Sequence, residues 1–449
     1  MAETSPAMHI IRQVNTFFSE IRAIADLVNF VAGAEGDIDS TRFSDIFGDL
    51  PDPNFEQRTA MVELLAFYSS ILEGEAKLPN NSEEAISAAG LEYFYHEGRV
   101  QTRVKSESDF AHAGPYLSAV AGALSKPLPP ERSEIVRKSL LTQIVSAFEV
   151  HLGALMRIHL SVHRKALGAD EKEFSLADLL AYGSIEEAVE DLVDRRVEDF
   201  TRRGLEHWAS QFERLGTPKM RDLAIDWDTF VEVLERRNAV VHHNSTVSRQ
   251  YVARVREAKR NNIQLRSILR IDVPYLNSAL PSVLAVGVGV GCSLALKLEK
   301  SEQSEIGNEI VDIQYSAMTQ GWWSVAEKMG GVLPANMRAG IRLRCQVNSW
   351  ISGQELNGPN SNRAEIERWD TSALAPIYKI AQRCLLGDYN AAVPEIIEIM
   401  KSGDLSEIDL RRWPLFKGLR ENVDLAQIFP HESGNGPAEG PESLQQNPS

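Results

Sequence analysis

The sequence predicts a mainly α-helical protein that is built from successive helical zones. Two observations carry this prediction. Apolar residues recur every three or four positions over long stretches, as they do on one face of an α-helix. Segments rich in proline or glycine separate these stretches and mark the zone boundaries. The chain has 449 residues, which is enough for two to four domains with substantial cores.

The charge balance is acidic. The chain carries 63 Asp and Glu against 47 Lys and Arg, a formal net charge of −16. General nucleic-acid binders are usually basic, because phosphate contacts supply most of their affinity. We therefore expect a protein that does not coat DNA, although a local basic patch is compatible with this balance.

The sequence also favours a cytoplasmic protein with no membrane partner. No uninterrupted apolar run approaches the roughly 20 residues of a membrane helix. The N-terminus lacks the basic-then-apolar order of a signal peptide. Three widely spaced cysteines, Cys292, Cys345 and Cys384, predict neither a disulfide framework nor a metal site.

We expect no cofactor and no metal. Residues Gly287 to Gly291 partly match the glycine pattern of a dinucleotide-binding fingerprint. The strand that precedes this fingerprint, its sixth-position glycine and its later acidic residue are missing here. These glycines therefore predict a closely packed helix. His159 and His163 have a spacing that can hold a metal ion, but no third ligand is visible near them.

The first zone, residues 1–124, is predicted to be mostly helical, and the sequence assigns it no role. Helical spacing covers Ile10–Val31 and Phe55–Leu72. Two short strands, Leu91–Tyr95 and Val100–Val104, predict a small hairpin.

A proline-rich linker at 125–132 precedes the second helical zone, 133–300. Ser184 has the form of a helix N-cap. Residues Asp228–Val241 form a further helix, and Pro274–Lys297 the last. The first helix of this zone carries a broad apolar stripe: Leu140, Leu141, Ile144, Phe148, Leu152, Leu155, Met156 and His159.

The third zone, residues 301–430, is also predicted to be helical. Residues Ala373–Ile399 predict a helix–turn–helix with the texture of a tetratricopeptide-like pair, in which small residues such as Ala381 and Ala391 permit close crossing. The tail at 431–449 is rich in Gly, Pro, Glu, Ser, Gln and Asn, which predicts disorder.

The strongest candidate site is the hexad Arg237-Asn238-Ala-Val-Val-His242 at the end of a predicted helix. Asn238 and His242 are four residues apart and share a helix face, whereas Arg237 lies about 140° from His242 around the helix axis. Arginine binds phosphate with a permanent planar charge, and histidine exchanges protons near neutral pH. Together they suit cleavage of a phosphodiester.

A looser spacing, in which histidine follows arginine by five to seven residues, has little value because it recurs in the chain. It also matches Arg157/His163, Arg202/His207, Arg236/His242 and Arg237/His243. His243 is kept as an additional candidate, and the tighter hexad that includes Asn238 carries the prediction.

Residues 235–251 resemble the signature of the HEPN superfamily, a group of helical-bundle domains found in ribonuclease toxins and abortive-infection proteins. The resemblance continues past the hexad through Asn244, Val247-Ser248 and Tyr251. The helix around Phe148-Glu149 looks like the first long helix of the family, and Leu176–Leu215 looks like its middle. The resemblance covers about 133–300.

The resemblance implies a site in which Arg237 holds the scissile phosphate, His242 acts as acid or base and Asn238 orients the substrate. Glu149 is a further candidate, because an acidic residue on the first long helix sometimes joins the site. The family typically works as a homodimer that places two Arg/His sets in one cleft.

We therefore expect a metal-independent endoribonuclease of toxin or phage-defence type, with an RNA such as tRNA as substrate. An antitoxin or another regulatory protein is an expected partner. The alternative is a non-catalytic HEPN dimerisation or adaptor module that binds a partner protein through its helical flanks, because some domains of this kind have lost catalysis.

Overall fold

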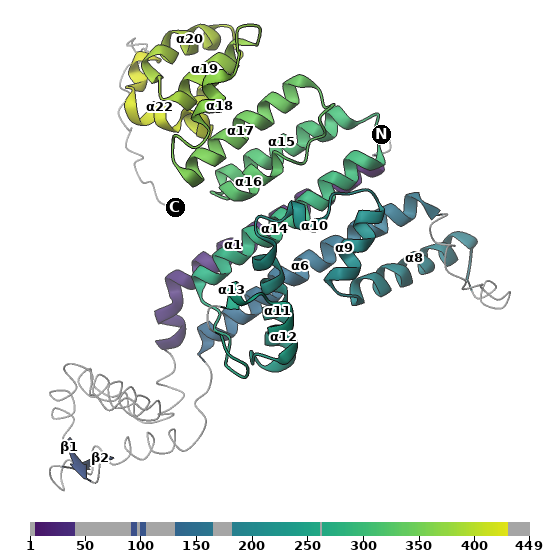
Figure 1. The fold of residues 1–449 in the computed structure, drawn as a ribbon, viewed down its shortest axis with the longest axis vertical. Coiled ribbons are helices and arrows are strands. Elements are labelled where there is room, and N and C mark those ends of the chain that lie inside the picture. The colour runs from purple at the N-terminus through teal and green to yellow at the C-terminus, as the bar shows by residue number, and fades with distance from the viewer. Residues whose placement is uncertain are drawn as a thin grey trace, which may run out of the picture. The chain divides into compact units, whose positions relative to one another are not determined.

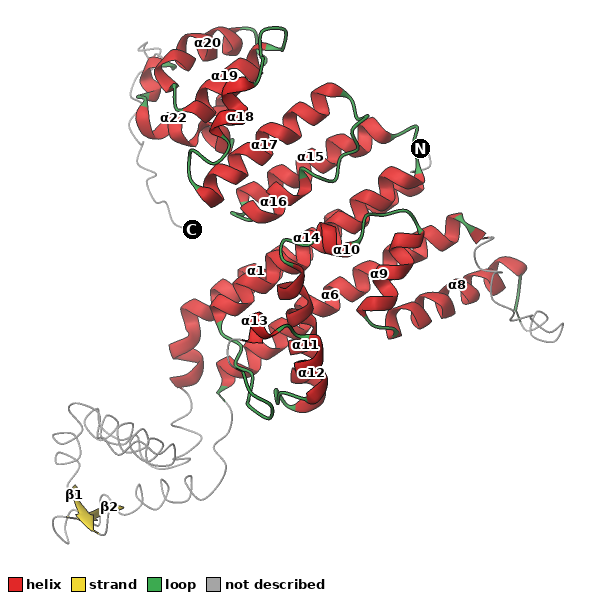
Figure 2. Ribbon diagram, in the orientation of Figure 1, coloured by secondary structure: helices red, strands yellow, loops and turns green. Residues whose placement is uncertain are grey.

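The computed structural model describes residues 5–40, 91–96, 99–104, 131–164, 182–260 and 263–429. This part of the chain is mainly α-helical, as the sequence predicted, and its strands form one small hairpin (Figure 2). Three predictions fall outside the described residues: the helix over Phe55–Leu72, most of the linker at 125–132, and the tail at 431–449.

Figure 1 labels the elements in chain order. Up to residue 300 the helices are α1 (Pro6–Ser40), α6 (Arg132–Val162), α8 (Ile185–Arg202), α9 (Leu205–Arg214), α10 (Met220–Leu223), α11 (Trp227–His243), α12 (Arg249–Arg254), α13 (Glu257–Arg260) and α14 (Val273–Leu298). The predicted helices over Ile10–Val31, Asp228–Val241 and Pro274–Lys297 correspond to α1, α11 and α14, each of which extends further than predicted.

The chain divides into two compact units. One contains Met1–Ile24, Thr142–Leu269 and Asn277–Ser449, and the other contains Ala25–Leu141 and Arg270–Leu276. Helices α1, α6 and α14 each contribute residues to both units.

Arg137 holds three segments of the smaller unit together. Its guanidinium forms an ion pair with Glu35 on α1, and its Nε donates a hydrogen bond to the carbonyl of Ile271 at 2.8 Å. One side chain on α6 therefore contacts both α1 and the segment that leads into α14.

In the larger unit, α14 packs against α1 at glycines. A Cβ atom at Gly287 would collide with the Phe17 ring, and one at Gly291 would collide with Val14. The prediction that these glycines serve a packed helix is confirmed. Residues of α1, which the sequence assigned to the separate zone 1–124, are part of this core. Periodicity shows that a helix has an apolar face, but it does not show which helix covers that face.

Aromatic rings join α1, α6 and α11 in the same core. Phe148 lies edge-on to Phe230, with ring centroids 5.4 Å apart, and contacts Phe17 at 6.4 Å. His151 is buried and stacks on Phe17 at 4.4 Å. The apolar stripe predicted on α6 is buried from Leu140 to Met156, whereas His159 at its end is only partly buried.

Helix α8 begins where the sequence placed a cap. The Ser184 side chain accepts a hydrogen bond from the backbone N–H of Glu187, and the Glu187 carboxylate accepts one from the backbone N–H of Gly183. At the other end of α8, the Trp208 indole donates to the carbonyl of Phe200 at 2.9 Å. The same carbonyl also accepts from the backbone N–H of Arg203 at 3.2 Å, so two donors meet it at the helix end.

The strands β1 (Leu91–His96) and β2 (Arg99–Val104) pair antiparallel, with Leu91 opposite Val104 and His96 opposite Arg99. The predicted hairpin is therefore confirmed, with each strand extended by one residue.

Beyond residue 300 the helices are α15 (Gln303–Thr319), α16 (Trp323–Met329), α17 (Ala339–Asn357), α18 (Arg363–Arg368), α19 (Pro376–Leu386), α20 (Tyr389–Lys401), α21 (Glu407–Arg412) and α22 (Lys417–Asn422), with short 3-10 turns η2 (Pro414–Phe416) and η3 (Leu425–Gln427). Helices α15, α16 and α17 pack side by side (Figure 1).

The predicted helix–turn–helix is formed by α19 and α20. Gly387 ends α19 in the left-handed conformation, with φ 84°, which favours glycine because it has no Cβ. Ala381 is buried as expected, but the small residue buried on α20 is Ala392, whereas Ala391 is exposed. The tetratricopeptide-like character of the pair stays a prediction.

Two helices, α6 and α14, are long and apolar enough to cross a membrane by length and composition. Inside this protein, however, 61% of the apolar window of α6 and 94% of that of α14 are buried. This is the burial expected of core helices in a soluble protein. All three cysteines are free and buried, and burial raises the pKa of each thiol to about 12.

Candidate functional site

The candidate site lies at the C-terminal end of α11. Asp226 caps the start of the helix by accepting a hydrogen bond from the backbone N–H of Asp228 at 3.0 Å. Asn244 ends it in the left-handed conformation, with φ 45°, and its N–H donates to the carbonyl of Ala239. Since α11 runs to residue 243, both His242 and His243 lie in its last turn.

Arg237 forms an ion pair with Glu149 of α6. The two side chains are 15% and 27% exposed, so the pair is largely but not fully shielded from solvent. Within the described residues, the Nε of Arg237 is buried and has no hydrogen-bond partner. The guanidinium is thus fixed through its terminal nitrogen, and the bond brings together two residues that lie 88 positions apart along the chain.

The other predicted residues stand apart from this pair. Asn238 is partly buried, whereas His242 and His243 are exposed. The Arg237 side chain bonds to Glu149, and no hydrogen bond joins it to His242 in the described part of the chain. Arg237 and His242 therefore border the same helix end without touching within one chain.

Arg236, the neighbour that matched the looser spacing, has a structural role instead. Its Nε lies 2.6 Å from the Glu232 carboxylate, and both side chains are buried. The Tyr251 hydroxyl donates to the same carboxylate at 2.7 Å. Burial, with the nearby charge of Glu232, raises the pKa of Tyr251, so its hydroxyl stays a proton donor.

Further ion pairs seat α12 and α13 beside α11. Arg254 pairs with Glu235 at 2.9 Å, Arg256 with Asp228 at 3.1 Å, and Lys259 with Asp226 at 2.5 Å. The acidic side chains of α11 and its cap thus neutralise cations in the segment that follows α11 in the sequence.

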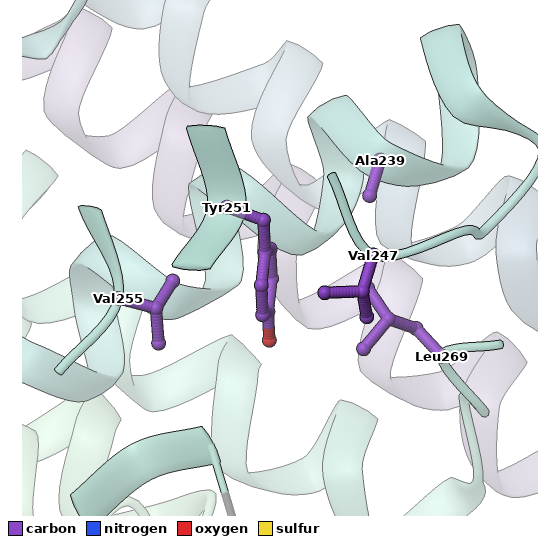
Figure 3. Close-up of a cluster of buried hydrophobic side chains, with 5 residues drawn as sticks. All are labelled: Ala239, Val247, Tyr251, Val255 and Leu269. Carbon is purple, nitrogen blue, oxygen red and sulfur yellow. The ribbon is translucent and has the colours of Figure 1, made fainter. Parts of the chain in front are cut away.

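The residues after the hexad that resemble the HEPN signature turn the chain back on itself. Val247 and Tyr251 are buried in a cluster with Ala239, Val255 and Leu269. Figure 3 shows the Tyr251 ring between Val255 on one side and Val247 and Leu269 on the other. Ser248 caps α12 by accepting from the backbone N–H of Tyr251. This part of the pattern serves packing and capping.

Backbone hydrogen bonds tie this turn to a second loop. The carbonyl of Val247 accepts from the N–H of Arg266 at 3.0 Å, and its N–H donates to the carbonyl of Ser267 at 2.9 Å. Leu269 donates to the carbonyl of Ser245 at 2.8 Å, and Thr246 bridges Ile268. The two segments therefore form one anchored unit at the end of α11.

Sequence reasoning missed a concentration of positive charge here. Only one acidic residue, Glu257, lies between positions 236 and 270. The Lys and Arg residues in that stretch are Arg236, Arg237, Arg249, Arg254, Arg256, Lys259, Arg260, Arg266 and Arg270. A window of local charge along the sequence would have found it, whereas the net charge of the whole chain conceals it.

His159 and His163 stack on each other with ring centroids 4.5 Å apart. Burial lowers the pKa of His159, and His163 lowers it further. No group of three His, Cys, Asp or Glu side chains with metal-binding geometry occurs among the described residues.

Comparisons with protein-family models, with curated proteins and with solved structures give no significant match to this chain.

Proposed function

We propose that the chain is a HEPN-type endoribonuclease that cleaves RNA without a metal ion. The observation that carries this proposal is that Glu149 holds the mostly buried Arg237 on α11, the helix whose last turn presents the exposed His242. A fixed cation and an accessible imidazole in one site are the minimum set for cleavage of RNA, because the substrate supplies its own nucleophile, the 2′-hydroxyl.

In this proposal Arg237 binds the non-bridging oxygens of the scissile phosphate. An arginine fork matches phosphate geometry and stays charged at all working pH values. Glu149 removes much of the rotational freedom of the guanidinium before RNA arrives, which lowers the entropic cost of binding. One oxygen of Glu149 suffices for this, so the terminal N–H groups of Arg237 that do not bind Glu149 are left to meet phosphate.

His242 acts as the acid or base. The 2′-oxygen attacks phosphorus and loses its proton to an imidazole, while the bond from phosphorus to the 5′-oxygen breaks and that oxygen takes a proton from a protonated imidazole. The products are a 2′,3′-cyclic phosphate and a 5′-hydroxyl. Asn238, one helix turn before His242, orients the substrate, and His243 is the additional candidate for proton transfer.

A homodimer would complete the site. Val150, next to Glu149, is 65% exposed, and Val241, one turn after Arg237, is 49% exposed. We assign these two valines, on the helices that carry the Arg237–Glu149 pair, to the face that the second chain would cover. A two-fold axis through this face would bring two Arg237/His242 sets together and provide one imidazole for each proton transfer.

The biological setting that we propose is cytoplasmic toxin or phage defence, with an RNA such as tRNA as target and an antitoxin or another regulatory protein as partner. The net charge of −16 limits indiscriminate RNA binding, whereas the basic stretch at 236–270 provides local attraction.

The test is cleavage of total RNA by purified protein in EDTA. We expect Arg237→Ala and His242→Ala each to lower the rate at least about 100-fold, in line with the loss of an acid–base group or a phosphate donor. The matched control is Arg202→Ala/His207→Ala, which removes a pair with the same spacing and should retain the rate. Equal cleavage by all variants would contradict the proposal.

A non-catalytic adaptor is the second candidate. A cavity of about 840 Å³ between α19 and α20, lined by residues that include Trp369, Lys379 and Ile399, favours partner binding by the C-terminal helices. If wild-type protein cleaves no RNA but is a dimer that retains a partner through this cavity, the adaptor function is supported instead.

A further inference from the structure

We infer that Arg249 and Arg266 form a second phosphate-binding surface that holds an unpaired stretch of RNA next to Arg237 and His242. This inference rests on the proposed function and names the class of RNA that the site accepts. The ion pairs around α11 distinguish the cations that are already neutralised from those that are not.

Most of the cations in the basic stretch are engaged. Arg254, Arg256 and Lys259 pair with carboxylates of α11 and its cap. In contrast, Arg249 and Arg266 are exposed, and neither forms an ion pair with any residue that the structure describes. Two full positive charges are therefore available in a chain whose net charge is −16.

The backbone places these two arginines together. The N–H of Arg266 donates to the carbonyl of Val247, and Arg249 follows Val247 by two residues. The N–H of Thr246 donates to the carbonyl of His243 at 2.8 Å, so the same turn joins the histidines of α11. Hydrogen-bonded segments at the end of α11 thus carry both arginines, Arg249 and Arg266, and both histidines, His242 and His243.

The loop at Arg266 is held in a defined shape. Arg266 itself adopts a left-handed backbone conformation, with φ 70°, which is uncommon for a residue with a side chain. Its N–H and the carbonyl of Ser267 both bond to Val247. A surface that is fixed before binding loses less conformational entropy when a phosphate arrives.

Exposed apolar side chains next to these cations indicate an unpaired strand. Leu265 is 46% exposed and Ile268 is 69% exposed, on either side of Arg266. The bases of an unpaired strand can turn outward and contact such side chains, whereas a duplex presents phosphates and 2′-hydroxyls. Attack by a 2′-hydroxyl also requires it to lie opposite the leaving oxygen, which an unstacked backbone permits.

The test is RNA binding that does not depend on cleavage. The probe is a labelled single-stranded RNA in which every 2′-hydroxyl is methylated, titrated with full-length protein over a range of salt concentrations. We expect Arg249→Gln/Arg266→Gln to weaken binding about tenfold at low salt. The slope of log affinity against log salt should fall by about 1.4, since each phosphate contact contributes about 0.7 on single strands.

The control is Arg338→Gln/Arg342→Gln, which removes the same charge from two exposed arginines at the start of α17. This control should leave the RNA affinity and its salt dependence unchanged. Circular dichroism checks that each variant is folded. Wild-type affinity in the Arg249/Arg266 variant would overturn the inference. Equal affinity for a duplex of the same sequence would overturn the assignment to unpaired RNA. Displacement of the RNA by poly-glutamate at equal charge would instead assign the surface to an acidic protein.

The two proposals fail in different ways. Loss of cleavage on His242→Ala, with binding unaffected by Arg249→Gln/Arg266→Gln, supports the enzyme and contradicts this surface. Binding that weakens as expected in a wild-type protein that cleaves no RNA supports this surface and contradicts the enzyme.

Discussion

Glu149 on α6 and Arg237 on α11 form an ion pair that is more than two-thirds buried on each side. Removing either partner leaves the other poorly solvated. We expect Glu149→Ala to lower the free energy of unfolding by about 1–3 kcal/mol, and Glu149→Gln by less, because its amide oxygen can still accept from Arg237.

A double-mutant cycle of Glu149→Ala and Arg237→Ala, measured by urea unfolding, isolates the interaction energy between the two side chains. The expected coupling energy is about 1–2 kcal/mol, between the values of exposed and fully buried pairs. Additive effects of the two substitutions would show that the pair does not fix Arg237.

The exposed valines beside this pair predict the oligomeric state. A carboxylate at Val150 or Val241 would be buried without a partner in a two-fold interface. We expect wild-type protein to be a dimer at micromolar concentration in analytical ultracentrifugation, and Val150→Asp and Val241→Asp to be monomeric and inactive. Ile408→Asp on α21, at a position 64% exposed against 65% for Val150, is the control and should remain dimeric. A monomeric wild type would count against both the enzyme and the adaptor.

The contact between α1 and α14 predicts opposite outcomes for two glycines in helices. Gly287→Ala places a methyl group against Phe17 and should lower the free energy of unfolding by about 1–3 kcal/mol. On α17, a methyl group added by Gly340→Ala has no neighbour within 4 Å. This substitution should raise the free energy of unfolding by about 0.5–1 kcal/mol. Thermal unfolding measures both. A neutral Gly287→Ala would mean that α1 does not pack on α14 in solution.

The sequence predicted the helices of this core but not their partners. The stripe on α6, the cap at Ser184 and the hairpin follow from local spacing and local hydrogen bonds, which a sequence displays directly. The burial of Tyr251 against Glu232 and the pairing of α1 with α14 do not, because they join segments that are distant along the chain.

The candidate site shows the same limit. The hexad located Arg237 and His242, and the resemblance suggested Glu149, but neither distinguished Arg236, whose charge is used inside the fold, from Arg237. The acidic residues along α11 neutralise some of the nearby cations and leave others free. Only the three-dimensional arrangement shows that these acidic residues pair with cations at positions 254–259.

His151 predicts a pH dependence of stability. Its Nε2 donates to the carbonyl of Gly287 at 3.1 Å, and burial lowers its pKa from 6.5 to about 4. As the pH falls below 6.5, the unfolded chain binds a proton that the folded chain does not bind until about pH 4. Stability from this residue is therefore fully present above pH 6.5 and is lost as the pH falls to 4.

The loss from His151 should amount to about 3 kcal/mol over that range. Urea unfolding of wild type and His151→Gln at pH 7, 5.5 and 4.5 measures it, because the difference between the two curves removes the contribution of the carboxylates. Parallel curves would show that His151 is not a buried neutral residue.

The products of RNA cleavage in EDTA test the central claim most directly. If Arg237 and His242 promote attack by the 2′-hydroxyl, wild-type protein will leave 2′,3′-cyclic phosphate and 5′-hydroxyl ends. A single 2′-deoxy substitution at a mapped cleavage position will then abolish cutting at that position alone, and His242→Ala will cut every position at least about 100-fold more slowly than wild type. Cleavage at the 2′-deoxy position, or an undiminished rate in His242→Ala, would contradict the account.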